Sequence, residues 1–262
     1  MRDADYIGHL KNIEQKAYDV GKRVRTEIKN PNNGYDARVS TFYLIAQAVR
    51  WFKISLIFKN EYLNNPLNPH WYNKIYLSKY RQQQPEIGYV PLEGIKGRGL
   101  LMPEINDYRL NLINEFEDVL RVAYSQVLYS IMESKFRLFL LALDQHALDN
   151  TDKFSSVYHL LLKKIEKRKY EHLIWFFSLI RNTIHNNGKY WNTRMRCVCT
   201  KYKGNIFKFE HDNMVNLSGG AFTVLLLYIT PDVIDMMEDI ILNSKLIKIN
   251  SIPEPVWDRD SS

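Results

Sequence analysis

Apolar residues recur along most of this chain with the spacing of amphipathic helices, and this spacing limits the fold more than any other feature. The longest example runs from Ile105 to Leu143, where apolar side chains return every three or four residues on one broad stripe. That period belongs to the α-helix, because in a strand alternate residues share a face. The chain is therefore expected to fold mainly as packed helices.

The same period predicts helices on both sides of the long one. They cover Asp3–Lys29, Asp36–Lys59, Phe154–Lys167, Glu171–Asn186 and Phe222–Leu246, the last with a kink or restart at Pro231. Between Met195 and Glu210 the period changes, and Lys203-Gly204-Asn205 predicts the turn of a short β-hairpin. We expect an all-α antiparallel helical bundle with a small β-hairpin and an N-terminal helical extension.

The stretch from residue 64 to residue 103 interrupts the helical pattern, with five prolines and four glycines. A length of 262 residues suits one large domain, or a domain with a substantial extension. We therefore divide the chain into a helical extension with an irregular loop (1–104), a helical domain (105–250) and a loose tail (251–262).

Composition places the chain among ordinary globular proteins, with 45% hydrophobic and 25% charged residues. The apolar runs Phe136–Leu143 and Phe222–Thr230 are shorter than the roughly 18–20 residues of a membrane-spanning helix. The N-terminus carries charges where a signal peptide would have its apolar core. These features predict a soluble cytoplasmic protein with no membrane partner.

Positive charge is concentrated in one quarter of the chain. Between Thr151 and His211 there are thirteen Lys and Arg against four Asp and Glu, a net charge of +9 within a chain of +7. Such a concentration favours an anionic partner, and nucleic acid first, whereas the alternative is a solvated helix face. The candidate RNA-binding residues are Lys163, Lys164, Lys167, Arg168, Lys169 and Lys189.

The two cysteines, Cys197 and Cys199, lie two residues apart in a probable strand. A zinc site would need two further ligands, and His211 is the nearest candidate. We interpret both as structural or incidental thiols, and predict neither a metal site nor a cofactor.

The segment Leu173–Gly188, LIWFFSLIRNTIHNNG, contains the residues best suited to catalysis. Arg181 and His185 are four residues apart, so on a helix both lie at the edge of the apolar face. An arginine presents a planar fork of donors that matches phosphate oxygens, and a histidine transfers protons near neutral pH. This pair suits cleavage of a phosphodiester. The alternative is structural, with Arg181 at the helix end and His185 in a satisfied hydrogen bond.

The run Arg181-Asn182-Thr183-Ile184-His185-Asn186 resembles the signature of HEPN domains, all-α proteins whose motif is Arg, a polar residue, a short spacer and His. The context is similar too, since the motif follows a long helix containing Glu133 and Arg137 and precedes a C-terminal helix. The resemblance covers roughly residues 106 to 246. It implies a homodimer whose paired motifs form a metal-independent endoribonuclease site. It also implies a place in toxin–antitoxin or phage-defence systems, with an antitoxin or defence partner protein.

This chain departs from the family pattern in one respect, because three residues separate Arg181 from His185 where four to six are usual. Asn186 occupies the place that a four-residue spacer would give to histidine. The resemblance therefore leaves two functions open. The first is an RNA endonuclease with Arg181, His185, Asn182 and Asn186 as catalytic residues and Glu133 and Arg137 in support. The second is an inactive HEPN-like module that binds RNA or protein.

The apolar face of the same segment also predicts where two copies would meet. Phe176, Phe177 and Ile180 lie beside the polar residues of the motif. The edge of this face therefore suits a two-fold interface, and we expect a homodimer that packs residues 173–184 near its symmetry axis.

Overall fold

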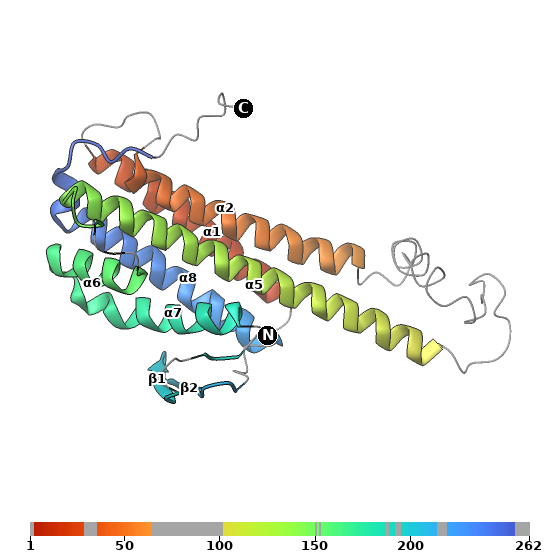
Figure 1. The fold of residues 1–262 in the computed structure, drawn as a ribbon. Coiled ribbons are helices and arrows are strands. Elements are labelled where there is room, and N and C mark those ends of the chain that lie inside the picture. Colours follow the sequence, from red (N-terminus) through yellow and green to blue (C-terminus); the bar gives the residue numbers. More distant parts are fainter. Residues whose placement is uncertain are drawn as a thin grey trace, which may run out of the picture.

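A computed structural model describes residues 3–28, 36–63, 102–149, 151, 153–186, 189–191, 195–213 and 219–254. The structure is mostly helical (75%), with six α-helices and one two-stranded antiparallel hairpin within these ranges. The helices lie side by side in a bundle, and the hairpin lies at one edge of it (Figure 1). The predicted all-α class with a small hairpin is confirmed. Most of the predicted irregular stretch, residues 64–101, and the tail beyond residue 254 lie outside the described residues.

Every predicted helix is present, with ends that differ by a few residues. The α-helices are α1 (Asp3–Glu27), α2 (Ala37–Phe58), α5 (Met102–Leu143), α6 (Phe154–Lys164), α7 (Glu171–His185) and α8 (Gly219–Leu242). The shorter helical turns are η1 (Lys59–Leu63), η3 (Arg168–Tyr170) and η4 (Lys245–Lys248). Helix α8 continues through Pro231, so the restart predicted at that residue does not occur.

One continuous core joins all of these helices. Its buried side chains extend from Tyr6 in α1 to Ile252 beyond η4, so α1 and α2 pack on the same core as α5 and α8. Helices α1 and α2 approach closely at Gly21, where a Cβ atom would lie 3.2 Å from the Cβ of Phe42. The division of the chain after residue 104 stays a prediction, although both parts contribute to this core.

Helix α2 and the turn η1 together, Ala37–Leu63, are long and apolar enough to cross a membrane by length and composition. Arg50 and Lys53 lie within this segment, so the sequence shows no uninterrupted apolar run there. In the most apolar stretch of this segment 44% of the residues are buried inside the structure. The core helix of a folded protein can have the same length and apolar composition. The buried side of α2 packs in the bundle, whereas its opposite side exposes large apolar side chains to solvent.

The hairpin consists of β1 (Val198–Tyr202) and β2 (Asn205–Phe209), with Tyr202 opposite Asn205. Its two turn residues, Lys203 and Gly204, have φ angles of 48° and 84°, as a type I′ turn requires. The predicted turn at Lys203-Gly204-Asn205 is thus confirmed, with Asn205 as the first residue of β2.

Candidate functional site

The apolar face of α7 is buried as its spacing predicts. Ile174, Phe176, Phe177 and Ile180 are fully buried. Phe176 stacks on Tyr202 of the hairpin at 4.7 Å, and Phe177 meets the edge of Tyr129 in α5 at 5.4 Å. These contacts fix α7 between α5 and the hairpin, and they fix which residues of the motif reach the surface.

Arg181 lies half-buried at the edge of this face, as expected. Its guanidinium carbon is 5.3 Å from the centre of the Tyr129 ring, a distance suited to a cation–π contact. The Nε atom is buried and has no hydrogen-bond partner, and the side chain makes no ion pair within the described part of the chain. Arg181 is thus a half-buried cation at the edge of α7, and its guanidinium has a hydrogen-bond donor that no described residue accepts from.

The ring of Tyr129 contacts the guanidinium of Arg181. Its hydroxyl lies 3.1 Å from the Oγ of Ser178 on α7. Burial raises the pKa of Tyr129 above its usual value, and the nearby Glu133 acts in the same direction, while Arg181 partly opposes both. Tyr129, Glu133 and Arg181 are therefore close enough to influence one another, and Tyr129 stays neutral at physiological pH.

The other residues of the motif lie at the end of α7. The helix ends at His185, whose side chain lies outside the described residues. Asn182 is exposed, and Asn186 is the C-cap residue, with its side-chain amide donating to the carbonyl of Asn182 at 2.8 Å. Asn186 thus has a structural task at the helix end, whereas the side chain of Asn182 is open to solvent.

Glu133 and Arg137 form an ion pair one helical turn apart, with Nη2 of Arg137 2.8 Å from Oε1 of Glu133. The intrahelical pair was one of the two roles predicted for these residues. Glu133 also raises the pKa of Tyr129, the residue whose ring the guanidinium of Arg181 contacts. The supporting role beside the motif stays a prediction.

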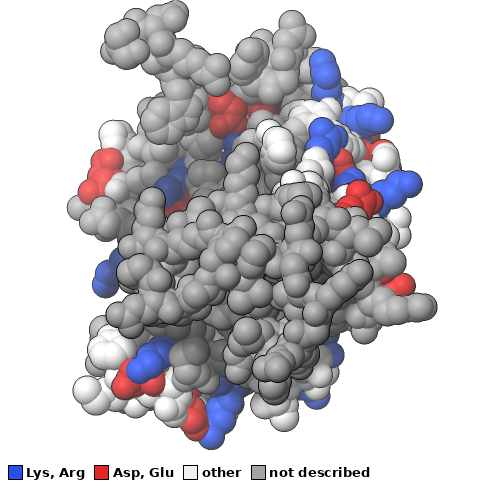
Figure 2. All heavy atoms as spheres, turned by 90° about the vertical axis from the view of Figure 1, so that its right-hand side faces the viewer, with Lys and Arg blue, Asp and Glu red and all other residues white. Residues whose placement is uncertain are grey.

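The predicted RNA-binding residues are mostly engaged with acidic side chains. Lys164 pairs with Asp144 at 2.9 Å, Lys167 and Lys169 each with Asp239 at 2.9 Å, Lys189 with Asp212 at 2.9 Å, and Arg168 approaches Glu171 at 3.9 Å. Lys163 is exposed, with no ion pair to another described residue. Where side chains are coloured in Figure 2, basic and acidic groups likewise lie beside one another. The excess charge of the 151–211 segment is therefore partly offset by carboxylates outside it.

Asp239 of α8 is the centre of this pairing. It accepts hydrogen bonds from Lys167 and from the hydroxyl of Tyr170, the latter at 2.8 Å. Burial alone would raise the pKa of Asp239, but the hydrogen bonds from Lys169, Lys167, Asn243 and Tyr170 outweigh it and hold the pKa well below its usual range. The carboxylate is thus ionised in the folded protein and joins α8 to the chain between α6 and α7.

We expect Asp239→Asn to flatten the loss of stability in acid. Since the folded pKa of Asp239 lies below its ordinary value of 3.8, the stability it contributes is present above that pH and is lost as the pH falls towards the folded pKa. Urea unfolding between pH 3 and pH 7 should show a shallower decline for the variant than for wild type. Asp235→Asn, a half-exposed carboxylate of the same helix, serves as the control. Equal slopes for wild type and Asp239→Asn would contradict the prediction.

The apolar side chains beside the predicted two-fold contact are buried. Phe176, Phe177 and Ile180 have no exposed area, because α5 and the hairpin cover them within one protomer. These three side chains therefore do not themselves form a contact between copies, and the packing of residues 173–184 near a symmetry axis, through the edge of this face, stays a prediction. The homodimer itself stays a prediction.

Two features of the site were missed from the sequence. Tyr129 lies one helical turn before Glu133, and that spacing was the available signal for its place under Arg181. The carboxylates that neutralise the basic segment gave no signal, because Asp239 is 72 residues from Lys167.

The two cysteines lie at the start of the hairpin, exposed and free, with their sulfur atoms 3.9 Å apart. No group of three or more potential metal ligands occurs among the residues the structure describes.

Comparison with known proteins found no matching family model, no similar curated protein and no similar solved structure. The resemblance to HEPN domains therefore rests on the motif and on its helical context.

Proposed function

We propose that the C-terminal end of α7 is a metal-independent RNA-cleaving site in which Arg181 binds the scissile phosphate and His185 transfers protons. The observation that carries the proposal is the state of Arg181, a half-buried cation that makes no ion pair within the described residues and whose Nε lacks a hydrogen-bond partner. An unsatisfied buried donor costs about 1–3 kcal/mol, more when the group is charged. Because the side chain is only half-buried, the solvent-facing part of its planar guanidinium could bind phosphate oxygens.

The chemistry follows from the two side chains. Neutral His185 takes the proton of a ribose 2′-hydroxyl, whose oxygen attacks the adjacent phosphorus. The bond from phosphorus to the 5′ oxygen breaks, and the imidazolium formed at His185 returns its proton to that oxygen. The products are a 2′,3′-cyclic phosphate and a 5′-hydroxyl end. Arg181 stabilises the negative charge that develops on the phosphoryl oxygens.

A second function is favoured by one observation, the three-residue spacer between Arg181 and His185. The middle spacer residue, Thr183, is fully buried, and its hydroxyl donates to the carbonyl of Leu179 at 3.0 Å. The spacer is thus helical and anchored, so it holds the motif in helical register. In this alternative the surface binds RNA through Arg181 and Asn182 and does not cleave it.

The experiment compares Arg181→Ala with Arg23→Ala on RNA that cannot be cleaved because its 2′-hydroxyls are methylated. Arg23 is an exposed arginine of α1 that pairs with Glu238, far along the chain from the motif. We expect Arg181→Ala to weaken binding and to lower by about one the slope of log affinity against log salt, since one phosphate contact is lost. Arg23→Ala should bind like wild type.

The same two variants are then tested for cleavage of unmodified RNA in EDTA. Loss of cleavage in Arg181→Ala alone supports the nuclease, and binding without cleavage by wild type supports the second function. Equal binding and equal cleavage by both variants would remove Arg181 from either function.

A further inference from the structure

The outward side of α2 is mostly apolar from Leu44 to Phe58. Leu44, Gln47, Trp51, Ile54 and Phe58 follow one another at alternating intervals of three and four residues, the spacing of a seam between packed helices. Trp51 is 60% exposed, Phe58 46% and Ile54 43%. No charged residue belongs to this seam. The α2 seam thus has the pattern of an interface and nothing in the described structure covering it.

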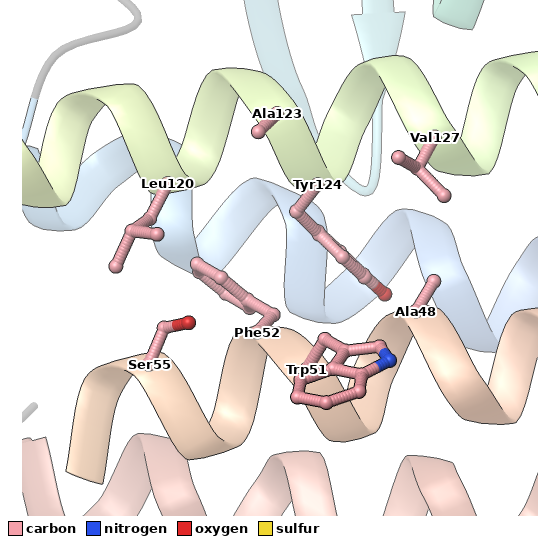
Figure 3. A pocket seen from close by; sticks show the side chains of 8 residues that line it. All are labelled: Ala48, Trp51, Phe52, Ser55, Leu120, Ala123, Tyr124 and Val127. Carbon is pink, nitrogen blue, oxygen red and sulfur yellow. The ribbon is translucent and has the colours of Figure 1, made fainter. Parts of the chain in front are cut away.

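Helix α5 extends this surface. Val119 is 64% exposed and Val127 47%, and Ala123 between them is also exposed. A groove of about 170 Å³ runs between the two helices, lined almost entirely by apolar atoms. In Figure 3, Trp51 and Phe52 from α2 and Leu120, Tyr124 and Val127 from α5 surround this groove. The stacked rings of Phe52 and Tyr124, 4.7 Å apart, belong to its wall.

The exposed apolar area is close to that of one side of a standard protein interface. Eight large apolar side chains of α2, η1 and α5 are exposed, namely Leu44, Trp51, Ile54, Phe58, Tyr62, Val119, Val122 and Val127. Taken with ordinary side-chain areas they expose on the order of 700 Å². The largest patch on a typical monomer is about 300–600 Å², and a standard interface buries about 800 Å² per partner. The face therefore approaches the area that one side of a stable dimer needs.

The charges beside this face select the class of partner. On the α5 side Asp118 pairs with Arg121 and Glu133 with Arg137. On the α2 side Arg50 and Lys53 pair with Glu14 of α1. These charges are thus paired within the chain, which leaves little unpaired positive charge beside the face to attract an anionic membrane surface or a nucleic acid. The partner that fits is a protein with an uncharged apolar face of its own.

A second copy of this chain has the same apolar face, formed by the same pair of antiparallel helices. Ser40 near the start of α2 contacts Lys135 of α5, and Lys59 just after the end of α2 pairs with Glu117, so the two helices are antiparallel neighbours (Figure 1). An antiparallel pair with an exposed apolar side is half of a four-helix bundle. A two-fold axis along the helices places α2 of each copy against α5 of the other. The large side chains of α2 then face the small ones of α5.

We propose that the α2 seam and the exposed face of α5 form a homodimer interface that completes an antiparallel four-helix bundle. Trp51 and Ala123 line the same groove, so they lie at the same height along the helices. A two-fold axis along the helices preserves that height, and Trp51 of one copy therefore packs on Ala123 of the other. The proposal is independent of the RNA-cleaving function.

The first experiment measures the mass in solution. Wild type should be a dimer of 31.1 kDa chains at about 10 μM by sedimentation equilibrium, a concentration in the range where specific dimers form. Trp51→Glu and Ala123→Arg should each give monomers with unchanged circular dichroism. Ile206→Lys, at a hairpin residue that is 78% exposed, is the matched control and should stay dimeric. A monomeric wild type, with or without binding to phosphatidylcholine vesicles, would overturn the proposal.

The second experiment tests which helices meet. Trp51→Cys and Ala123→Cys are made separately in chains in which Cys197 and Cys199 are replaced by serine. Under mild oxidation the mixture of the two variants should form a disulfide-linked dimer, and each variant alone should not. A disulfide formed by Trp51→Cys alone would mean that α2 meets α2, and no disulfide in the mixture would mean that this face is not the interface. Either result overturns the proposed pairing.

Discussion

Replacing His185 with alanine is expected to lower the rate of RNA cleavage by about 10²–10⁴-fold, the usual contribution of a general acid–base. Binding of methylated RNA should stay close to that of wild type, because the imidazole acts on the 2′-hydroxyl proton and Arg181 holds the phosphate. The measurement is single-turnover cleavage of a labelled RNA in EDTA. The residue lies at the last position of α7, so the substitution should leave the helix intact.

The matched control for this prediction is His159→Ala. His159 is an exposed histidine of α6 whose ring lies 3.5 Å from Glu171. It should cleave RNA at the wild-type rate. Full cleavage by a folded His185→Ala protein would end the catalytic interpretation of the motif, whatever the behaviour of Arg181→Ala.

The second large effect is expected at the start of α2, where Arg38 and Asp36 form a fully buried ion pair at 2.6 Å. Arg38 also donates from Nη1 to the carbonyls of Leu246 and Ile249, both at 2.8 Å, and so connects α2 to η4. Burial alone would raise the pKa of Asp36, but the hydrogen bonds from Arg38 and from the backbone N–H of Ile252 hold it below its usual range. The pair is thus charged, satisfied and far from water.

Arg38→Ala should lower the free energy of unfolding by about 3–5 kcal/mol, because it leaves the charge of Asp36 buried without its partner. Arg23→Ala, which breaks an exposed ion pair with Glu238, should cost no more than about 1 kcal/mol. Urea unfolding of the two variants against wild type measures both values. A loss for Arg38→Ala no larger than for Arg23→Ala would show that the buried pair does not stabilise this part of the fold.

The helices could be predicted from sequence because their signal is local. The period of apolar residues and the stop at Asn186 placed α7 to within one residue of its observed end. The hairpin turn was predictable for the same reason, since Lys203 and Gly204 occupy the two turn positions.

The environment of the basic segment could not be predicted, because it depends on residues distant along the chain. Lys167 meets Asp239 across 72 residues, and Arg38 meets the carbonyl of Leu246 across 208. Periodicity shows which side of a helix is apolar, but it does not show which helix lies opposite. This limit also explains why the sequence did not show what covers each apolar face. Phe176 faces the hairpin of its own protomer, whereas Trp51 on α2, in an equally apolar segment, is exposed.

The most direct test of an RNA-cleaving site on α7 is the cleavage of single-stranded and tRNA-like RNA by wild type and by the double variant Arg181→Ala/His185→Ala, with EDTA present throughout. We predict that wild type cleaves at least one of these RNAs and leaves a 2′,3′-cyclic phosphate, and that the double variant, with an unchanged melting temperature, does not. Cleavage that requires a divalent ion, or equal cleavage by both proteins, would contradict the site. Absence of cleavage by wild type, with salt-dependent binding retained, would assign the surface to RNA binding alone.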